Sequence, residues 1–184
     1  MVASRLIVHA GGELGTVYGR NGKQHLLDQL PAYNNAARNA PWLVLLDLDQ
    51  DFDCAPPFRT QWMPNPSRFL SFRLAVRAVE AWLLADSEMV ADFLRVSRTI
   101  VPESPDDLAA PKQVIVNLAR RSRKRAIKTD MVPRVGSGRS IGPAYTSRLM
   151  EFATNSWRPA VAAERSDSLR RALNSLTSLV ALPW

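Results

Sequence analysis

A continuous apolar run, Trp42 to Leu46, constrains the fold of this chain more than any other feature. Such a run, without polar alternation, is typical of a strand buried on both faces of a parallel sheet. It ends at a cluster of four aspartates within seven residues, which are Asp47, Asp49, Asp51 and Asp53. Ligands of open α/β sheets gather at the carboxyl ends of strands, so the cluster is expected at the working edge of a sheet.

Other segments complete the predicted architecture. Leu6–Val8 and Phe69–Val76 are also predicted as strands. Helices are predicted over 23–38, 79–85, 87–95, from 111 onward, 142–155 and 167–179, several of them marked by a cap or an initial proline. Pro31 should break or kink the first helix. We therefore expect an α/β fold with a mainly parallel sheet flanked by helices, a helical C-terminal half, and one domain over residues 1–184.

The aspartate cluster suggests a metal site. Asp47 and Asp49 are two residues apart, and on an extended backbone their side chains point the same way. Two hard oxygen ligands suit Mg²⁺ or Mn²⁺, and Asp51 is a third candidate ligand. The alternative is a solvated strand-to-loop turn, where aspartate is common. Against it, crowded carboxylates repel one another unless a cation offsets them.

Glu80 is the second candidate, because it lies in the otherwise almost wholly apolar stretch 75–85. A carboxylate there is expected to be at least partly buried, and a buried charge needs a partner. The partner is either a metal shared with Asp47 and Asp49 or a basic side chain in a plain ion pair. The cations considered for that pair are Arg73, Arg77 and Lys112.

Positive charge is concentrated in one segment. The net charge is +7, yet the stretch from Lys112 to Arg148 carries ten basic residues and one acid, so the rest of the chain is net −2. An anionic partner such as nucleic acid is expected, although no zinc-finger or RNP pattern indicates base-specific recognition. Gly142-Pro143 is expected to open a helix whose free N–H groups could hold a phosphate. The candidate nucleic-acid-binding residues are Arg120, Arg121, Arg123, Lys124, Arg125 and Arg139. The alternative is a solvated charged face.

Several classes of protein are disfavoured. No apolar run approaches the roughly 18 residues of a membrane span, and the N-terminal apolar run is too short for a secretory signal. The lone Cys54 excludes an intramolecular disulfide. We therefore predict a cytoplasmic protein with no membrane partner. The sequence does not determine its oligomeric state.

Four segments resemble the bacterial domain-of-unknown-function family 4276. They are Leu43–Asp49, Arg77–Asp86, Ala110–Lys112, and Gly142–Tyr145 continuing to Ser166–Leu169. The resemblance covers roughly residues 5 to 180, and its most specific part is the Glu-Ala-Trp-Leu-Leu-Ala-Asp element at 80–86.

This resemblance implies a Toprim-like, Rossmann-like fold. It would make Asp47 and Asp49 a Mg²⁺-binding pair, Glu80 a third acid with a catalytic role, and Lys112 a catalytic phosphate contact. It also implies a partner ATPase and a role as a phage-defence effector. Toprim-like chains usually begin with a further strand ending in Glu, followed by a helix, and we expect that segment to be absent here.

Three functional hypotheses follow. The first is a Mg²⁺- or Mn²⁺-dependent phosphodiesterase, a nuclease, in which the Arg/Lys segment holds the nucleic-acid backbone. The second is a non-catalytic module that binds nucleic acid or an ATPase and has a degenerate site. The third is a metal-dependent phosphatase that acts on small substrates. The motif of haloacid dehalogenase phosphatases is not met, because Asp47-Leu48-Asp49 follows an apolar strand but Asp51 stands where those enzymes have Thr or Val.

Overall fold

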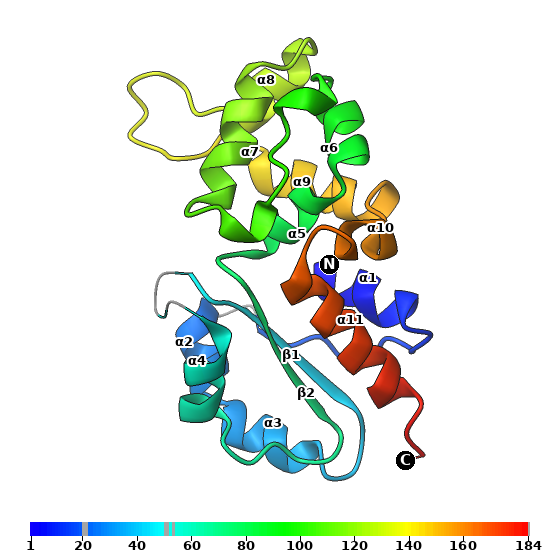
Figure 1. The fold of residues 1–184 in the computed structure, drawn as a ribbon. Coiled ribbons are helices and arrows are strands. Elements are labelled where there is room, and N and C mark those ends of the chain that lie inside the picture. Colours follow the sequence, from blue (N-terminus) through cyan, green and yellow to red (C-terminus); the bar gives the residue numbers. More distant parts are fainter. Residues whose placement is uncertain (20–21, 50–51, 53, 184) are drawn as a thin grey trace.

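The computed structural model describes residues 1–19, 22–49, 52 and 54–183. Figure 1 shows a sheet with its helices at one end of the molecule and a helical region at the other. Along the chain the elements are α1 (Val2–His9), α2 (Gly22–Asp28), α3 (Leu30–Ala36), β1 (Trp42–Asp47), α4 (Ala55–Trp62), β2 (Leu70–Ala75), α5 (Val79–Ala85), α6 (Ser87–Leu94), the 3₁₀ turns η1 (Arg98–Ile100) and η2 (Pro105–Asp107), α7 (Pro111–Arg120), α8 (Arg125–Met131), α9 (Tyr145–Asn155), α10 (Pro159–Ala163) and α11 (Asp167–Val180).

The sheet is parallel and small. β1 and β2 pair from Trp42 opposite Leu70 to Asp47 opposite Ala75, and they are the two strands found within the described residues. Both strands therefore end at the same edge. The predicted α/β class, with a parallel sheet flanked by helices and a helical C-terminal half, is confirmed.

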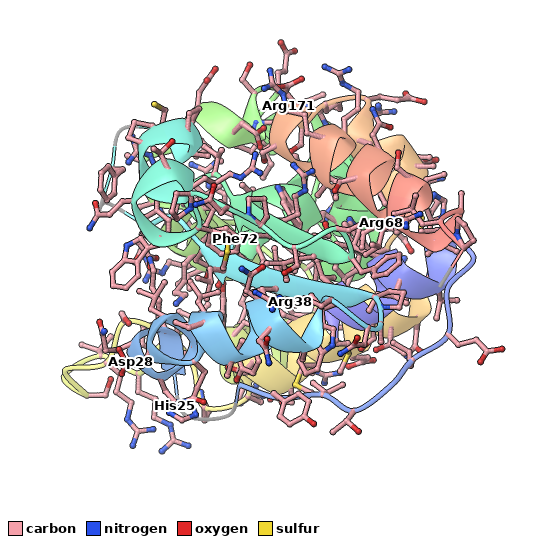
Figure 2. All side chains as sticks on the ribbon, turned by 90° about the horizontal axis from the view of Figure 1, so that it is seen from below. His25, Asp28, Arg38, Arg68, Phe72 and Arg171 are labelled. Atoms are coloured by element: carbon pink, nitrogen blue, oxygen red, sulfur yellow. The ribbon has the colours of Figure 1, made fainter. Side chains whose placement is uncertain are left out.

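Helices cover both faces of the sheet. Val44, Leu46 and Phe72 pack into a cluster with α2, α3 and α4, while Leu43 and Leu45 pack against the larger core that includes α1 and α11. The Phe72 ring lies 6.4 Å from that of Phe58 in α4, and Figure 2 labels Phe72 among the side chains around the strands. Alternate side chains thus enter two cores, as the unbroken apolar run predicted.

The prediction of a strand at Leu6–Val8 is wrong, because this segment belongs to α1. A short apolar run fits a strand or part of a helix equally well, and only its surroundings decide between them. Here Leu6 is fully buried while Val8 is 55% exposed, which is the one-sided burial of a surface helix. The helix packs against α9, α10 and α11.

The other predicted elements occur close to their expected positions. The helix predicted over 23–38 is divided at Gln29 into α2 and α3, and Pro31 lies in the first turn of α3, where its missing N–H costs no helical hydrogen bond. Asp86 and Ser166 cap α6 and α11 through their side chains. The helix expected from Gly142 begins instead at Tyr145.

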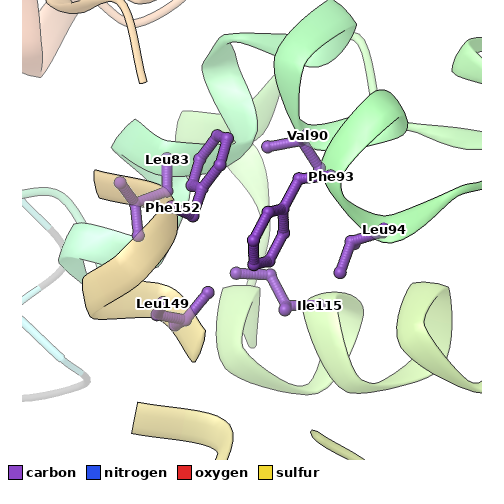
Figure 3. Close-up of a pocket in the computed structure, with 7 residues that line it drawn as sticks. All are labelled: Leu83, Val90, Phe93, Leu94, Ile115, Leu149 and Phe152. Carbon is purple, nitrogen blue, oxygen red and sulfur yellow. The ribbon is translucent and has the colours of Figure 1, made fainter. Parts of the chain in front are cut away.

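The helical region is tightly packed. Figure 3 shows a small gap near α6 and α9, with a volume of about 10 Å³ and walls of seven apolar side chains that include Phe93 and Phe152. A gap of this size is at the lower limit for one water molecule, so it is a packing interstice rather than a binding site. None of the described helices has both the length and the apolar character needed to cross a membrane.

Candidate metal and phosphate site at the strand ends

Two non-glycine residues at the paired strand ends adopt left-handed backbone angles. Asp49 has φ 54° and Arg77 has φ 61°. The Asp49 N–H donates to the Arg77 carbonyl (2.7 Å), and the Arg77 guanidinium donates to the Asp49 carbonyl (3.2 Å). Such angles cost energy and are concentrated at functional sites, so this edge is a candidate on backbone grounds alone.

Asp47 is the last residue of β1, and its half-buried carboxylate reaches the start of α5. Its Oδ1 accepts a hydrogen bond from the Val79 N–H (2.9 Å). The residue preceding α5, Ala78, has no side chain that could accept this bond, so Asp47 caps the helix from a neighbouring strand.

The surroundings of Asp47 oppose its charge. The pKa of its carboxyl is raised to about 6, chiefly by burial and in smaller part by the nearby negative charges of Glu80 and Asp49. The hydrogen bond from Val79 and the positive charge of Lys112 lower this pKa but do not offset the increase. At neutral pH Asp47 is therefore an ionised, poorly compensated carboxylate among other acids, which is the environment a cation would stabilise.

Glu80 lies beside Asp47 in the first turn of α5 and is only 6% exposed. The Tyr145 hydroxyl donates to its Oε1 over 3.4 Å, and Lys112 Nζ is 3.9 Å from the same oxygen. Burial, followed by the charge of Glu80 and this hydrogen bond, raises the pKa of Tyr145, so its proton is retained. Of the three cations considered for Glu80, Lys112 is the one found beside it.

Asp49 faces a different partner. Its Oδ2 forms an ion pair with Lys23 of α2 at 2.9 Å, because the left-handed turn at Asp49 ends the alternation that was expected to align it with Asp47. Asp51 lies outside the described residues. Within the described part of the chain, no group of three acidic, histidine or cysteine side chains could enclose a metal ion.

The basic segment presents its charges to solvent. All six candidate nucleic-acid-binding residues are exposed, and none forms an ion pair with another described residue; they are Arg120, Arg121, Arg123, Lys124, Arg125 and Arg139. The buried Ser122 hydroxyl accepts from the Lys124 N–H (3.0 Å), which fixes the turn that carries part of the cluster. In Figure 1, α7 begins near α5 and runs away from the sheet toward α8. Arg120 follows Lys112 by eight residues in this helix, which places it roughly 12 Å further along the helix axis.

The start of α9 differs from the phosphate-holding terminus that the sequence predicted. The N–H groups of Gly142 and Ala144 donate to the carbonyls of Met131 and Asp130. A Cβ at position 142 would collide with that same backbone, so the glycine is required for close packing. These two donors are therefore occupied within the protein.

Sequence reasoning misses two residues of this site. The spacing of Tyr145 indicates a core residue, and it is buried, but its hydroxyl bonds Glu80. A buried tyrosine hydroxyl needs a polar partner, and the one carboxylate of the nearly apolar helix is the feature of the sequence that could have indicated this partner. Gly22-Lys23 matches only part of the phosphate-binding loop motif, because Val17 and Gln24 stand where that motif needs Gly and Ser or Thr. Nothing in the sequence indicates the ion pair of Lys23 with Asp49.

No family model matches the chain, and neither a curated protein nor a solved structure matches it.

Proposed function

We propose that this protein is a Mg²⁺- or Mn²⁺-dependent phosphodiesterase that acts on nucleic acid. The observation that carries the proposal is the state of Asp47, whose pKa is raised to about 6 at the end of a parallel strand, beside Glu80 and Lys112. Strongly perturbed acids at this edge of an α/β sheet are typical of functional sites.

The residues present fit a magnesium-like ion. Mg²⁺ keeps several waters and usually takes one or two carboxylates plus substrate phosphates, so it does not need a cage of three acids. Asp47 would hold the ion through the oxygen that Val79 leaves free, with Glu80 as the neighbouring acid. When bound, such an ion polarises a phosphoryl oxygen and lowers the pKa of a bound water.

Other side chains of the protein would bind the phosphate, position Glu80 and attract the nucleic acid. Lys112, more than half exposed, contributes a positive charge beside Glu80, where a phosphate could bind. Tyr145 holds Glu80 in place and stays protonated. The exposed cations at 120–125 and Arg139 attract the nucleic-acid backbone without reading its sequence.

Resemblance supports the same function. The segments 43–49 and 77–86, which resemble domain-of-unknown-function family 4276, meet at the strand ends through Asp47 and Val79. A Toprim-like fold, a cytoplasmic location, a partner ATPase and a role as a phage-defence effector belong to this proposal.

The test is cleavage of labelled single-stranded DNA and RNA with Mg²⁺, Mn²⁺ or EDTA. We expect metal-dependent cleavage by the wild type and a loss of at least about 100-fold in Asp47→Asn, since that change removes the charge that would hold the ion. Asp167→Asn, at an exposed acid on α11, is the matched control and should cleave normally. Equal cleavage by Asp47→Asn, or cleavage in EDTA, would contradict the proposal.

A second function, a non-catalytic nucleic-acid-binding module, is favoured by the distance between the exposed cluster and Lys112. Under it, Arg120→Ala/Arg121→Ala would weaken binding of single-stranded DNA equally with Mg²⁺ and with EDTA. The slope of log affinity against log salt concentration would fall by about 0.7 for each phosphate that the variant no longer neutralises. Abolished binding in this variant, together with no cleavage by the wild type, would favour the module over the enzyme.

A further inference from the structure

A cavity of about 200 Å³ lies next to the strand-end site, between α1, α5, α7 and α9. Pockets for drug-sized ligands are typically about 300–1,000 Å³, so this cavity suits a single small ring system. Its walls are mostly apolar, with side chains such as Leu83, Ile141 and Leu149, whereas Glu80, Lys112 and Tyr145 supply its polar groups.

One oxygen of Glu80 is available to a ligand. Tyr145 and Lys112 both approach Oε1, and Oε2 has no hydrogen-bond partner among the described residues. Among the described residues, three polar side-chain atoms are fully enclosed and have no partner, and they are the Nε atoms of Arg5, Arg59 and Arg73. Glu80 Oε2 also lacks a partner in this part of the chain but is not one of these enclosed atoms, so it must be open to solvent-sized space. The cavity is the open space that Glu80 lines.

We propose that this cavity binds a nucleobase carrying an exocyclic amine, with the amine donating to Glu80. The proposal deepens the proposed function and rests on it for the phosphate, which Lys112 and the Asp47 edge would hold beside the base. Enzymes that accept an unstacked base hold its faces between apolar side chains and hydrogen-bond its edge, and this cavity offers both kinds of contact. Adenine, guanine and cytosine all present an exocyclic amine donor to a carboxylate, and guanine and cytosine stand for the purines and the pyrimidines in the test below. Uracil places two carbonyl oxygens around its single N–H, and a carboxylate repels them.

The test is calorimetric titration of the full chain in EDTA with guanosine, cytidine and uridine, which carry no phosphate. We expect guanosine and cytidine to bind at least about tenfold more tightly than uridine. Glu80→Gln should remove this preference, because its amide replaces half of the acceptor capacity with a donor.

Thr146→Trp should abolish nucleoside binding by filling the exposed side of the cavity. The adjacent Ser147→Trp, which does not line it, is the matched control and should bind normally. Equal affinity for the three nucleosides, no binding, or unchanged binding by Thr146→Trp would overturn the inference. Since these titrations contain no metal, nucleoside selectivity combined with a failure of metal-dependent cleavage would refute the phosphodiesterase and leave the base pocket standing.

Discussion

Two aspartates flank the helix α5, one half-buried and one fully buried, and their surroundings differ. Asp86 follows α5 and is fully buried. Arg158 donates to it three times, from its backbone N–H (3.1 Å), Nε (3.0 Å) and Nη2 (2.7 Å), and Met89 N–H adds a longer bond (3.4 Å). A bidentate guanidinium contact is among the strongest ways to satisfy a buried carboxylate.

Asp47 precedes α5 and has one hydrogen-bond donor among the described residues, the Val79 N–H. Its neighbours include two further acids, and its pKa is raised to about 6. The protein therefore supplies Asp86 with enough donors and positive charge to stabilise its carboxylate, whereas Asp47 is short of positive charge. The difference separates a structural carboxylate from a candidate functional one, although both lie at ends of regular elements and look alike in the sequence.

The largest expected effect comes from removing the side chain that stabilises Asp86. Arg158→Ala leaves the Asp86 carboxylate buried without its guanidinium and should lower the free energy of unfolding by more than substitutions at Asp47, Tyr145 or Lys112 do. Urea denaturation at pH 7.5 measures it. Arg170→Ala removes an arginine from an exposed pair with Asp167 on α11 and is the matched control. It should change the free energy of unfolding by about 0.5 kcal/mol or less. Equal decreases in the two variants would mean that Asp86 depends on its arginine no more than an exposed carboxylate does.

The next effect concerns pH. Between pH 3.8 and about 6, folded Asp47 binds a proton that the unfolded chain has released, so its contribution to stability falls as pH rises through that window. In EDTA, the wild type should lose about 1–3 kcal/mol relative to Asp47→Asn across this range and show no further relative change above it. Denaturation of both proteins from pH 3.5 to 8 isolates this effect, because the other titrating groups are shared. A constant difference would contradict the raised pKa.

A smaller effect is expected at Glu80. Tyr145→Phe removes one of its two donors without changing the packing of the ring, and it should lower the free energy of unfolding by about 1 kcal/mol. Lys112→Met, at a more exposed and longer contact, should change it by less. Denaturation curves rank the two variants, and the reverse order would mean that Glu80 depends on charge rather than on the hydroxyl.

The sequence predicted the strand and helix that meet at the site because those elements depend on local patterns. The apolar run before Asp47 and the cap at Asp86 are such patterns, and both were found. The segment at Leu6–Val8 failed because three apolar residues carry no periodicity that separates a strand from a helix. The left-handed turn at Asp49 and the Tyr145–Glu80 contact depend on distant parts of the chain, so no local pattern indicated them.

The most direct measurement is a thermal melt of the wild type and Asp47→Asn at pH 7.5, first in EDTA and then in Mg²⁺. Asparagine keeps the oxygen that accepts from Val79 and removes the uncompensated charge, so Asp47→Asn should melt at a higher temperature than the wild type in EDTA. Mg²⁺ should raise the melting temperature of the wild type alone and narrow or reverse the gap. If Asp47→Asn melts lower in EDTA and Mg²⁺ changes neither protein, Asp47 is a structural carboxylate like Asp86 and the proposed metal site is wrong.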